Sequence, residues 1–241
     1  WDILGVRETV DKMETDGIPP AQWVYEMLEG GFTSFYKVEN GKKKFYDIPS
    51  RSYQNIPGQE DFIILDILNS SNKKIWGNAG SSIYDMGDEV IGLEFHTKMN
   101  SLGAEVIEGI NTAINMAEKG YKGLVIGNEG QNFSAGANLA MLFMFAGDQD
   151  YDEVNLMTAQ FQNTMMRIRY SSIPVVAAPH QMALGGGCEL CMHSDKVVAH
   201  AESYIGLVEF GVGVIPGGGG TKEFALRLSD SLKKGDIRTN A

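Results

Sequence analysis

The sequence has few cysteines, a deficit of positive charge and no long hydrophobic run. Its two cysteines lie close together, which excludes a secreted disulfide framework. Acidic residues outnumber basic ones by 31 to 20, and the net charge of −11 argues against nucleic acid or an anionic membrane as the main partner. The longest apolar run, 139–146, is too short to span a bilayer, and the first residues lack a signal-peptide pattern and an initiator methionine. We therefore expect a cytoplasmic piece of a longer polypeptide.

The first part of the chain has its own pattern. Helices are predicted at 7–16 and 21–29, and strands at 35–38 and 44–46 flank Asn40-Gly41, which is typical of a hairpin turn. The segment 51–59 contains Pro57-Gly58 and is predicted to be a linker. We place a domain boundary near residue 58.

Strands and helices alternate beyond this boundary, which favours a layered α/β fold with one shared core. The expected elements are strands at 62–68 and 90–95, a helix at 101–119, a strand at 123–127, helices at 139–146 and 151–169, a strand at 175–178, a helix opening at Glu189 and a strand at 196–199.

Two glutamates in glycine-rich segments are the strongest candidates for chemistry. Glu189 ends the run Gly185-Gly186-Gly187-Cys188-Glu189, and Glu209 lies just ahead of the glycines at 217–220. Burying a carboxylate among apolar residues is unfavourable unless function requires it, and glycines let the main chain approach a substrate closely. The pattern indicates an acid/base site with main-chain donors.

Two loops could supply those donors. The small residues of 132–138 follow a buried strand and precede a helix, and the triple glycine before Glu189 has the same strand-to-helix context. Each loop would leave free N–H groups at a helix start, so each could donate one hydrogen bond to a developing oxyanion.

These motifs together resemble the crotonase (enoyl-CoA hydratase/isomerase) family over about residues 60–230. The residues that carry the resemblance are Phe133-Ser134-Ala135-Gly136-Ala137, Ala183-Leu184-Gly185-Gly186-Gly187-Cys188-Glu189, and Glu209 with Ile215-Pro216-Gly217-Gly218-Gly219-Gly220-Thr221. The resemblance implies an α/β fold of the crotonase-like layered β-β-α superhelix (ClpP/crotonase) type, preceded by a small helical and hairpin segment. Residues 2–7 and 36–46 resemble the end of a 3-hydroxyacyl-CoA dehydrogenase module. Residues 1–57 would then be the C-terminal remnant of that module, and 58–241 an enoyl-CoA hydratase domain truncated at its C-terminus.

Site roles follow from the resemblance. It implies an oxyanion hole from the amides of Ala137 and Gly186, with Glu189 and Glu209 as the acid/base pair. The implied substrate-binding residues are Ala135, Gly136, Asn138, Leu139 and Gly185. Asn138 departs from the Asp usual in relatives, and Ala140 from a Lys that some carry near the CoA adenine.

The sequence itself suggests how the two glutamates divide their roles. Glu189 is expected in the first turn of a helix, whose partial positive charge favours the carboxylate and a general base. Glu209 is flanked by apolar residues, where desolvation would raise its pKa and favour the neutral acid.

The function implied is hydration of trans-2-enoyl-CoA to 3-hydroxyacyl-CoA, within a fused protein that also oxidises 3-hydroxyacyl-CoA with NAD. The expected partner is an acyl-CoA substrate, and neither a nucleic-acid partner nor a membrane span is expected. The sequence is compatible with a homo-oligomer of the longer protein that contains this chain. Hydration needs no metal or redox cofactor, and NAD is expected only for the dehydrogenase module. Two alternatives stay open: an enoyl-CoA isomerase, which needs one carboxylate, and a non-catalytic acyl-CoA-binding fragment.

Other conspicuous residues favour structural roles. Cys188 and Cys191 are predicted to be buried thiols of a core-facing helix, and His180 a hydrogen-bonded structural residue. Core packing is favoured over an acyl channel for the methionines, which are Met141, Met144, Met157, Met165 and Met166. The glycines at 217–220 lack a following Lys-Ser/Thr and indicate a tight turn into a helix, not a phosphate loop.

Overall fold

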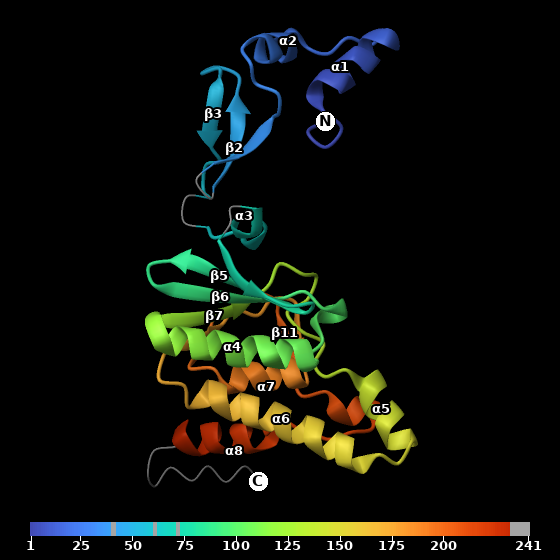
Figure 1. The fold of residues 1–241 in the computed structure, drawn as a ribbon, viewed down its shortest axis with the longest axis vertical. Coiled ribbons are helices and arrows are strands. Elements are labelled where there is room, and N and C mark those ends of the chain that lie inside the picture. Colours follow the sequence, from blue (N-terminus) through green and yellow to red (C-terminus); the bar gives the residue numbers. More distant parts are fainter. Residues whose placement is uncertain (40–41, 60–61, 71–72, 232–241) are drawn as a thin grey trace, which may run out of the picture. The chain divides into compact units, whose positions relative to one another are not determined.

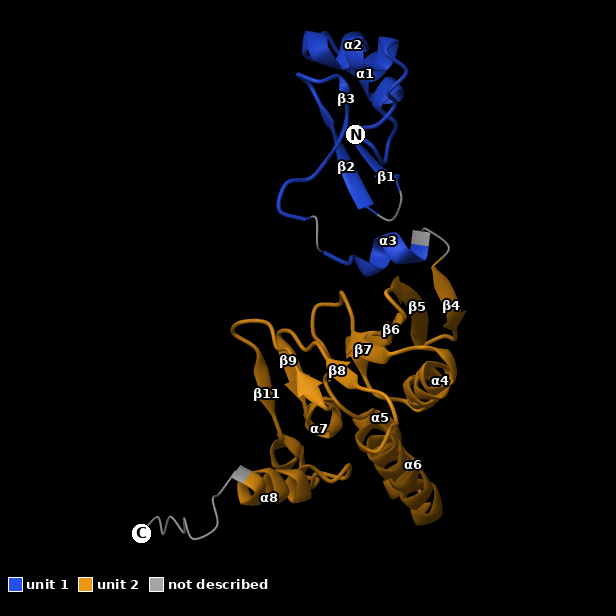
Figure 2. Ribbon diagram, turned by 90° about the vertical axis from the view of Figure 1, so that its left-hand side faces the viewer, with its two compact units in different colours: residues 1–71 blue, residues 72–241 orange. Residues whose placement is uncertain are grey.

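The structure is a computed structural model that describes residues 1–39, 42–59, 62–70 and 73–231. The chain forms two compact units, residues 1–71 and 72–241 (Figure 2). Helix α3 (Leu65–Ser70) belongs to the first unit, so the division falls later in the chain than the expected boundary near residue 58. Each unit has its own hydrophobic cluster.

The first unit combines helices with a three-stranded antiparallel sheet of order β1-β2-β3. Its elements besides α3 are α1 (Val6–Thr15), α2 (Gln22–Glu29), β1 (Tyr36–Glu39), β2 (Lys42–Asp47) and β3 (Ser52–Asn55). Strands β1 and β2 pair antiparallel, as the hairpin prediction requires, while its turn at Asn40-Gly41 lies outside the described residues. The carboxylate of Asp2 accepts hydrogen bonds from the amides of Phe35 and Tyr36, which fixes the start of the chain to the sheet.

The linker predicted at 51–59 is wrong in its first half, because β3 pairs with β2 there. Aromatic packing explains the strand. Tyr53 faces its cross-strand partner Tyr46 edge-on at 6.2 Å between ring centroids, and Phe32 contacts both rings. Such cross-strand aromatic pairs stabilise a sheet. The linker was predicted because Pro57-Gly58, a pair typical of turns and loops, lies in the same segment.

The second unit is built on a six-stranded mixed sheet of order β10-β8-β7-β6-β5-β4. Its strands are β4 (Lys74–Gly77), β5 (Ser81–Gly87), β6 (Val90–Phe95), β7 (Gly123–Gly127), β8 (Val175–Ala177) and β10 (Lys196–Val197). Strands β4, β5 and β6 are antiparallel neighbours, and β6, β7, β8 and β10 run parallel. A separate two-stranded parallel sheet joins β9 (Met182–Leu184) and β11 (Tyr204–Gly206).

Helices cover one face of this sheet in successive layers (Figure 1). They are α4 (Ala104–Gly120), α5 (Leu139–Gly147), α6 (Tyr151–Arg169), α7 (Gly186–His193) and α8 (Gly220–Ser231), with short 3-10 turns η1 (Lys98–Asn100) and η2 (Glu209–Val212). Helix α4 packs on β5 and β6, α6 packs on α4 and α7, and α7 packs on α8. The stack places α7 between the sheet side and α8.

The prediction of a strand at 62–68 is wrong, because α3 occupies Leu65–Ser70. A short apolar run does not distinguish a strand from a buried helical turn, and here Ile67 and Leu68 are buried while Phe62 and Ile63 are exposed. Strands β4 and β5 were not predicted. By contrast, the predicted strands at 90–95 and 123–127 and the helix at 151–169 match β6, β7 and α6 at both ends.

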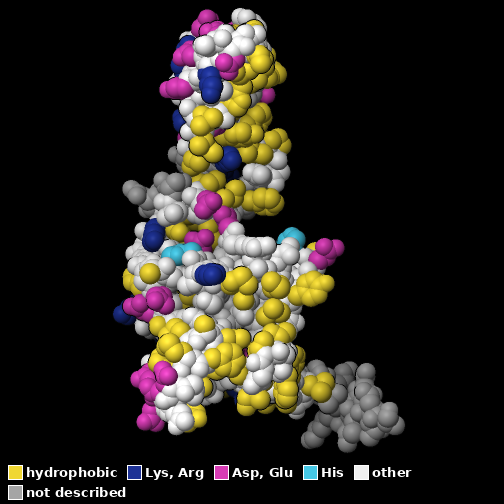
Figure 3. All heavy atoms as spheres, turned by 90° about the vertical axis from the view of Figure 1, so that its right-hand side faces the viewer, with side chains coloured by type: hydrophobic (Ala, Val, Ile, Leu, Met, Phe, Trp, Pro, Cys, Tyr) yellow, Lys and Arg dark blue, Asp and Glu magenta, His cyan; other side chains and the backbone are white. Residues whose placement is uncertain are grey.

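Helix α5 forms as predicted but contributes no buried residue. Phe143 and Met144 of this helix are exposed. Figure 3 shows hydrophobic side chains on the surface of the protein. Among the methionines predicted to pack in the core, Met165 is fully buried, whereas Met141 and Met144 are exposed. Within the described ranges, no helix is long and apolar enough to cross a membrane.

Candidate active site

Three parallel segments bring the predicted site residues to one end of the small sheet. Strands β9 and β11 pair in register, and the Gly185 amide extends this pairing by donating to the carbonyl of Gly206 at 2.9 Å. On the other side, Ser134 forms a parallel bridge with Ala183 of β9. Because the segments run parallel, the residues that follow them meet at the same edge: Ala137 after the first, Gly186 after the second and Glu209 after the third.

The two predicted oxyanion amides lie close together. A Cβ built on Gly186 would lie 3.6 Å from the amide nitrogen of Ala137. Gly136 has φ 90°, and a Cβ there would be 2.8 Å from the Leu184 carbonyl and 3.1 Å from the Gly186 nitrogen. Glycine is therefore required for the two loops to approach this closely. In the described part of the chain, neither the Ala137 nor the Gly186 amide donates to another main-chain group, so both are available to an oxyanion.

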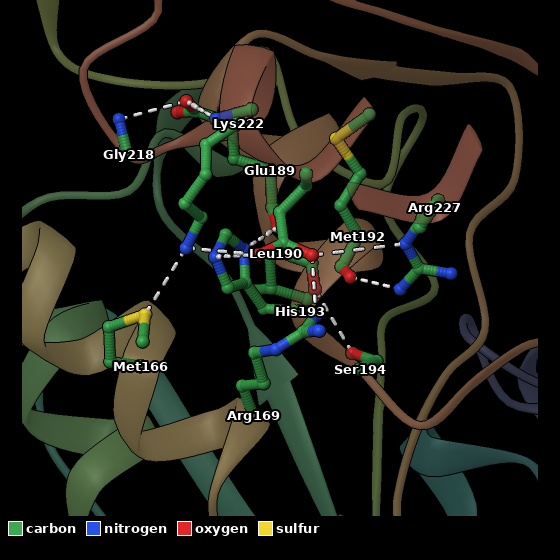
Figure 4. Close-up of polar contacts among 12 residues, drawn as sticks. Met166, Arg169, Glu189, Leu190, Met192, His193, Ser194, Gly218, Lys222 and Arg227 are labelled. Atoms are coloured by element: carbon green, nitrogen blue, oxygen red, sulfur yellow. Dashed lines mark hydrogen bonds and ion pairs between the residues drawn. The ribbon is translucent and has the colours of Figure 1, made fainter. Parts of the chain in front are cut away.

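Glu189 lies in the first turn of α7 and its side chain is buried. One carboxylate oxygen, Oε1, accepts hydrogen bonds from the amides of Gly218 and Gly220, both at 2.8 Å. Figure 4 shows the Gly218 amide and its hydrogen bond to the Glu189 carboxylate. A Cβ on Gly218 would lie 2.5 Å from Oε2, so glycine is needed there as well. The clamp on Oε1 leaves Oε2 as the oxygen that can accept a proton from a ligand.

The pKa of Glu189 is raised above that of an ordinary glutamate. Burial is the largest cause, and the negative charge of Glu209 acts in the same direction, while the amides of Gly220 and Gly218 act against them. The sequence argument from the positive helix end alone therefore gave the wrong direction, because desolvation outweighs it. A raised pKa brings the group closer to neutral pH, where a general base works best.

Glu209 begins η2, and its Oε2 is buried without a hydrogen-bond partner among the described residues. A Cβ on Gly185 would lie 3.2 Å from Glu209 Oε1, which places this carboxylate beside the loop that carries Gly186. Of the four apolar residues expected around Glu209, Val208, Phe210 and Val212 are exposed, and Leu207 is half-buried. Three of the four expected neighbours therefore do not cover the carboxylate.

The remaining predicted binding residues frame the first loop. The Ala135 amide donates to the Met99 carbonyl at 3.1 Å, so it holds the loop in place. Asn138 is the N-cap of α5, and its side-chain oxygen accepts from the Met141 amide at 3.4 Å. Leu139 is half-buried at the start of the same helix. Asn138 thus has a structural use in capping, whichever ligand the loop binds.

Sequence reasoning missed several residues that shape the site. The glycines at 217–220 were assigned to a turn, but the amides of Gly218 and Gly220 also donate to Glu189. His193 showed no pattern, yet its Nδ1 lies 2.7 Å from the main-chain oxygen of Glu189. Its ring is buried in a group of charged side chains with Arg169, Lys222 and Glu223. Only the glycine run carried a signal in the sequence, through its place in the family motif.

The structural assignments of the thiols and of His180 are confirmed. Cys188 and Cys191 are free and buried, and burial raises the pKa of the Cys188 thiol to about 11 and that of Cys191 to about 12. His180 Nε2 lies 2.7 Å from the Gly130 carbonyl. Neither thiol is available as a nucleophile near neutral pH.

Comparison with known proteins identifies the class that this fold and site define. The sequence model of the family described as "Enoyl-CoA hydratase/isomerase" matches residues 87–233, more than half of the chain. Solved structures agree: an enoyl-CoA hydratase from Polaromonas sp. JS666 is 28% identical with a TM-score of 0.57, covering 67% of this chain and 65% of that one. An enoyl-CoA hydratase from Bacillus anthracis is 26% identical with a TM-score of 0.55, covering 61% and 57%. The chain belongs to the enoyl-CoA hydratase/isomerase family, and its fold is the crotonase fold.

Relatives by sequence extend the similarity over the first unit. A probable 3-hydroxyacyl-CoA dehydrogenase from Bacillus subtilis is 43% identical over all 241 residues. A putative fatty acid oxidation complex trifunctional enzyme from Rickettsia felis is 36% identical over 77% of the chain. The chain spans 30% of the length of the first of these relatives and 25% of the second.

Proposed function

We propose that this chain hydrates trans-2-enoyl-CoA to 3-hydroxyacyl-CoA in fatty-acid β-oxidation. The observation that carries the proposal is the meeting, at one end of the β9/β11 sheet, of two buried carboxylates and two main-chain amides free of main-chain acceptors. Addition of water to a conjugated thioester needs a base for water, an acid for the α-carbon and donors for the enolate oxygen. The four groups supply these three functions.

In the proposed reaction, the thioester carbonyl accepts hydrogen bonds from the amides of Ala137 and Gly186. Glu189 removes a proton from water as its oxygen bonds to Cβ, and the π electrons move toward the carbonyl. Glu209 then donates a proton to Cα, which restores the thioester. A proton returns from Glu189 to Glu209 through solvent, so the net change is addition of one water molecule.

The pattern of hydrogen bonds on the glutamates supports this division of roles. Glu189 accepts two amide hydrogen bonds on Oε1, and such bonds favour the ionised, proton-accepting form. Glu209 has an unpartnered Oε2 among the described residues, which is free to carry a proton to the substrate. Two carboxylates beside one oxyanion loop favour hydration over isomerisation, which needs only one.

We further infer that the protein also oxidises 3-hydroxyacyl-CoA with NAD. The Bacillus subtilis relative that aligns with the entire chain is named a probable 3-hydroxyacyl-CoA dehydrogenase. The 3-hydroxyacyl-CoA in that name is the product of the proposed hydration. The first unit would belong to that dehydrogenase module. The hydration step itself uses no cofactor, and NAD serves only the oxidation.

Substitution of the two glutamates tests the hydratase proposal. Hydration of crotonyl-CoA by the intact protein is followed as loss of the enone-thioester absorbance. Glu189→Gln and Glu209→Gln should each lower kcat by about 10²- to 10⁴-fold, the usual contribution of a general acid or base. Glu153→Gln is the matched control, since Glu153 also lies in the first turn of a helix, α6, but is exposed. Undiminished hydration by Glu209→Gln would exclude its role as the acid, and binding of crotonyl-CoA without turnover by the unaltered protein would indicate a non-catalytic domain.

A further inference from the structure

A cluster of charged side chains lies behind the helix that carries Glu189 and takes no direct part in the proposed chemistry. At its centre is Glu223 in the first turn of α8, whose side chain is completely buried. A buried carboxylate is strongly unfavourable unless it is paired and hydrogen-bonded. The partners of Glu223 therefore indicate its role.

Partners reach Glu223 from three helices. Arg169, at the end of α6, contacts Oε2, and Lys222 Nζ lies 3.0 Å from Oε1. From α7, His193 Nε2 lies 3.5 Å from Oε1, and Arg227 Nε of α8 lies 4.0 Å from Oε2. Burial alone would raise the pKa of Glu223, but Lys222, His193 and Arg169 outweigh it and lower the pKa. Glu223 is therefore ionised and bridges α6, α7 and α8.

Two contacts connect this cluster to α7. His193 Nδ1 donates a hydrogen bond to the main-chain oxygen of Glu189 at 2.7 Å, and burial lowers the pKa of the imidazole. Arg227 donates to the carbonyl of Met192 in the last turn of α7. Figure 4 shows Arg169, His193, Lys222 and Arg227 gathered beside the helix that bears Glu189.

The same short segment also holds the Glu189 carboxylate. The Glu223 amide donates to the Gly219 carbonyl at 3.0 Å, which closes the first turn of α8 onto the glycine turn. On either side of Gly219, the amides of Gly218 and Gly220 donate to Glu189 Oε1. Residues 218–223 thus have a buried anchor at one end and a two-amide clamp at the other. Displacement of the anchor would move the clamp.

We propose that Glu223 is a positioning residue for Glu189: seated on Arg169 and Lys222, it holds the first turn of α8 so that the Gly218 and Gly220 amides reach Glu189 Oε1. This inference rests on the proposed hydration, in which Glu189 is the base. It assigns the buried charge cluster a role in orienting the base, beyond the joining of helices.

Glu223→Gln in the intact protein tests the proposal. This change removes the ion pairs but keeps the shape of the side chain, so the clamp should loosen. We expect kcat for crotonyl-CoA hydration to fall about tenfold, the rate equivalent of one lost hydrogen bond to a charged group, with KM little changed. The Gly218 and Gly220 amides lower the pKa of Glu189, so a looser clamp raises that pKa and moves the acidic limb of the kcat/KM profile to higher pH.

The direction of the shift separates positioning from simple electrostatics. Removal of a negative charge near Glu189, with the clamp intact, would lower its pKa and move the acidic limb to lower pH. A shift to lower pH, or none, would therefore overturn the proposal. If Glu223→Gln does not fold, Glu223→Asp replaces it, because it keeps the negative charge and shortens the side chain, so that electrostatics alone predicts no shift. An acidic limb that is unmoved in Glu223→Asp would overturn the proposal equally.

Glu118→Gln is the matched control. Glu118 of α4 also pairs with an arginine of α6, Arg167, and it accepts from the Ser172 amide, but these contacts do not involve α7 or α8. It should lower the melting temperature and leave the acidic limb in place. An equal shift in Glu118→Gln would show that Glu223 acts only through general stability. Absence of hydration in the unaltered protein would instead overturn the proposed function, and this inference with it.

Discussion

At the residue scale, the Glu189 carboxylate is held asymmetrically. Both amide donors bind Oε1, while Oε2 lies in the space that a side chain at Gly218 would fill. Burial and the Glu209 charge favour the protonated form, and the amides favour the ionised one. The position of the glycine turn therefore controls both the direction of the free oxygen and its basicity.

Adjacent glycines allow a direct test of this arrangement. Gly218→Ala would place a methyl group 2.5 Å from Glu189 Oε2, whereas a methyl group at Gly217 would meet Thr158 Cγ2 at an ordinary 3.8 Å. We expect Gly218→Ala to lower kcat for crotonyl-CoA hydration by about 10²-fold or more, since misplacement of a catalytic group by about 1 Å has this effect. Gly217→Ala should stay near wild type. Equal activity of the two variants in the absorbance assay would contradict the two-amide clamp on Glu189.

The raised pKa of Glu189 also predicts how stability depends on pH. Between the ordinary pKa of glutamate and the raised one, the folded state binds more protons than the unfolded state, so this group's contribution to stability is lost as pH rises through that window. Glu189→Gln removes the contribution. The melting temperature of Glu189→Gln relative to wild type should therefore increase with pH across the window. A pH-independent difference for Glu189→Gln would show that its pKa is not raised.

The sequence predicted some candidate site residues and could not predict others. Glu189, Glu209 and the loops at Ala137 and Gly186 stand in local motifs, so their types and spacing were sufficient to propose them, and the structure brings them to one end of the small sheet. The amides that hold Glu189 come from residues 218 and 220, and their role depends on how α8 meets α7. Glu223 and Arg169 are charged residues on helices, which ordinarily indicate a solvated surface, and only packing shows that Glu223 is buried.

At the element scale, prediction succeeded where a single period extends over many residues. The helix predicted at 101–119 forms as α4, and its residues Val106, Ile110, Ala113 and Ile114 recur at helical spacing and are all fully buried. The failures lie in short segments, α3 and β3, where tertiary contacts decide the conformation. The sequence also did not predict how closely α4 approaches β5. A Cβ on Gly109 of α4 would lie 2.9 Å from Ser81 Cβ of β5. Local periodicity defines an element, but not its distance from the next one.

The apolar run of α5 shows a second limit at this scale. Its residues predict a buried helix, yet none of them is buried in the described structure. A helix that is hydrophobic on all sides has no polar face, so its sequence does not show which side packs against a neighbouring element. The helix contacts α6. Its start is instead fixed by the cap that Asn138, the residue after Ala137, provides.

At the scale of the whole molecule, the two units have separate cores of different character. The first unit packs Val6, Met27 and Tyr46 with an aromatic border, whereas the second packs aliphatic side chains of the sheet, α4 and α6. The proposed site draws only on residues of the second unit. Separate cores predict that each unit loses stability independently of the other.

Substitutions in the two cores test this independence. Met27 and Ile110 are fully buried, one in each core, so truncation to alanine should cost the affected unit roughly 2–5 kcal/mol. Trp1 and Trp23 lie in the first unit, whereas Trp76 packs on the core of the second, so the test is made in a Trp76→Phe background. Tryptophan fluorescence then follows the first unit, while crotonyl-CoA hydration follows the second. In urea, Met27→Ala should lower the fluorescence midpoint by about 1 M or more and leave the midpoint of activity loss in place, and Ile110→Ala should chiefly do the reverse. Midpoints that move together in both variants would show that the units unfold as one, and that residues outside the second unit support its active site.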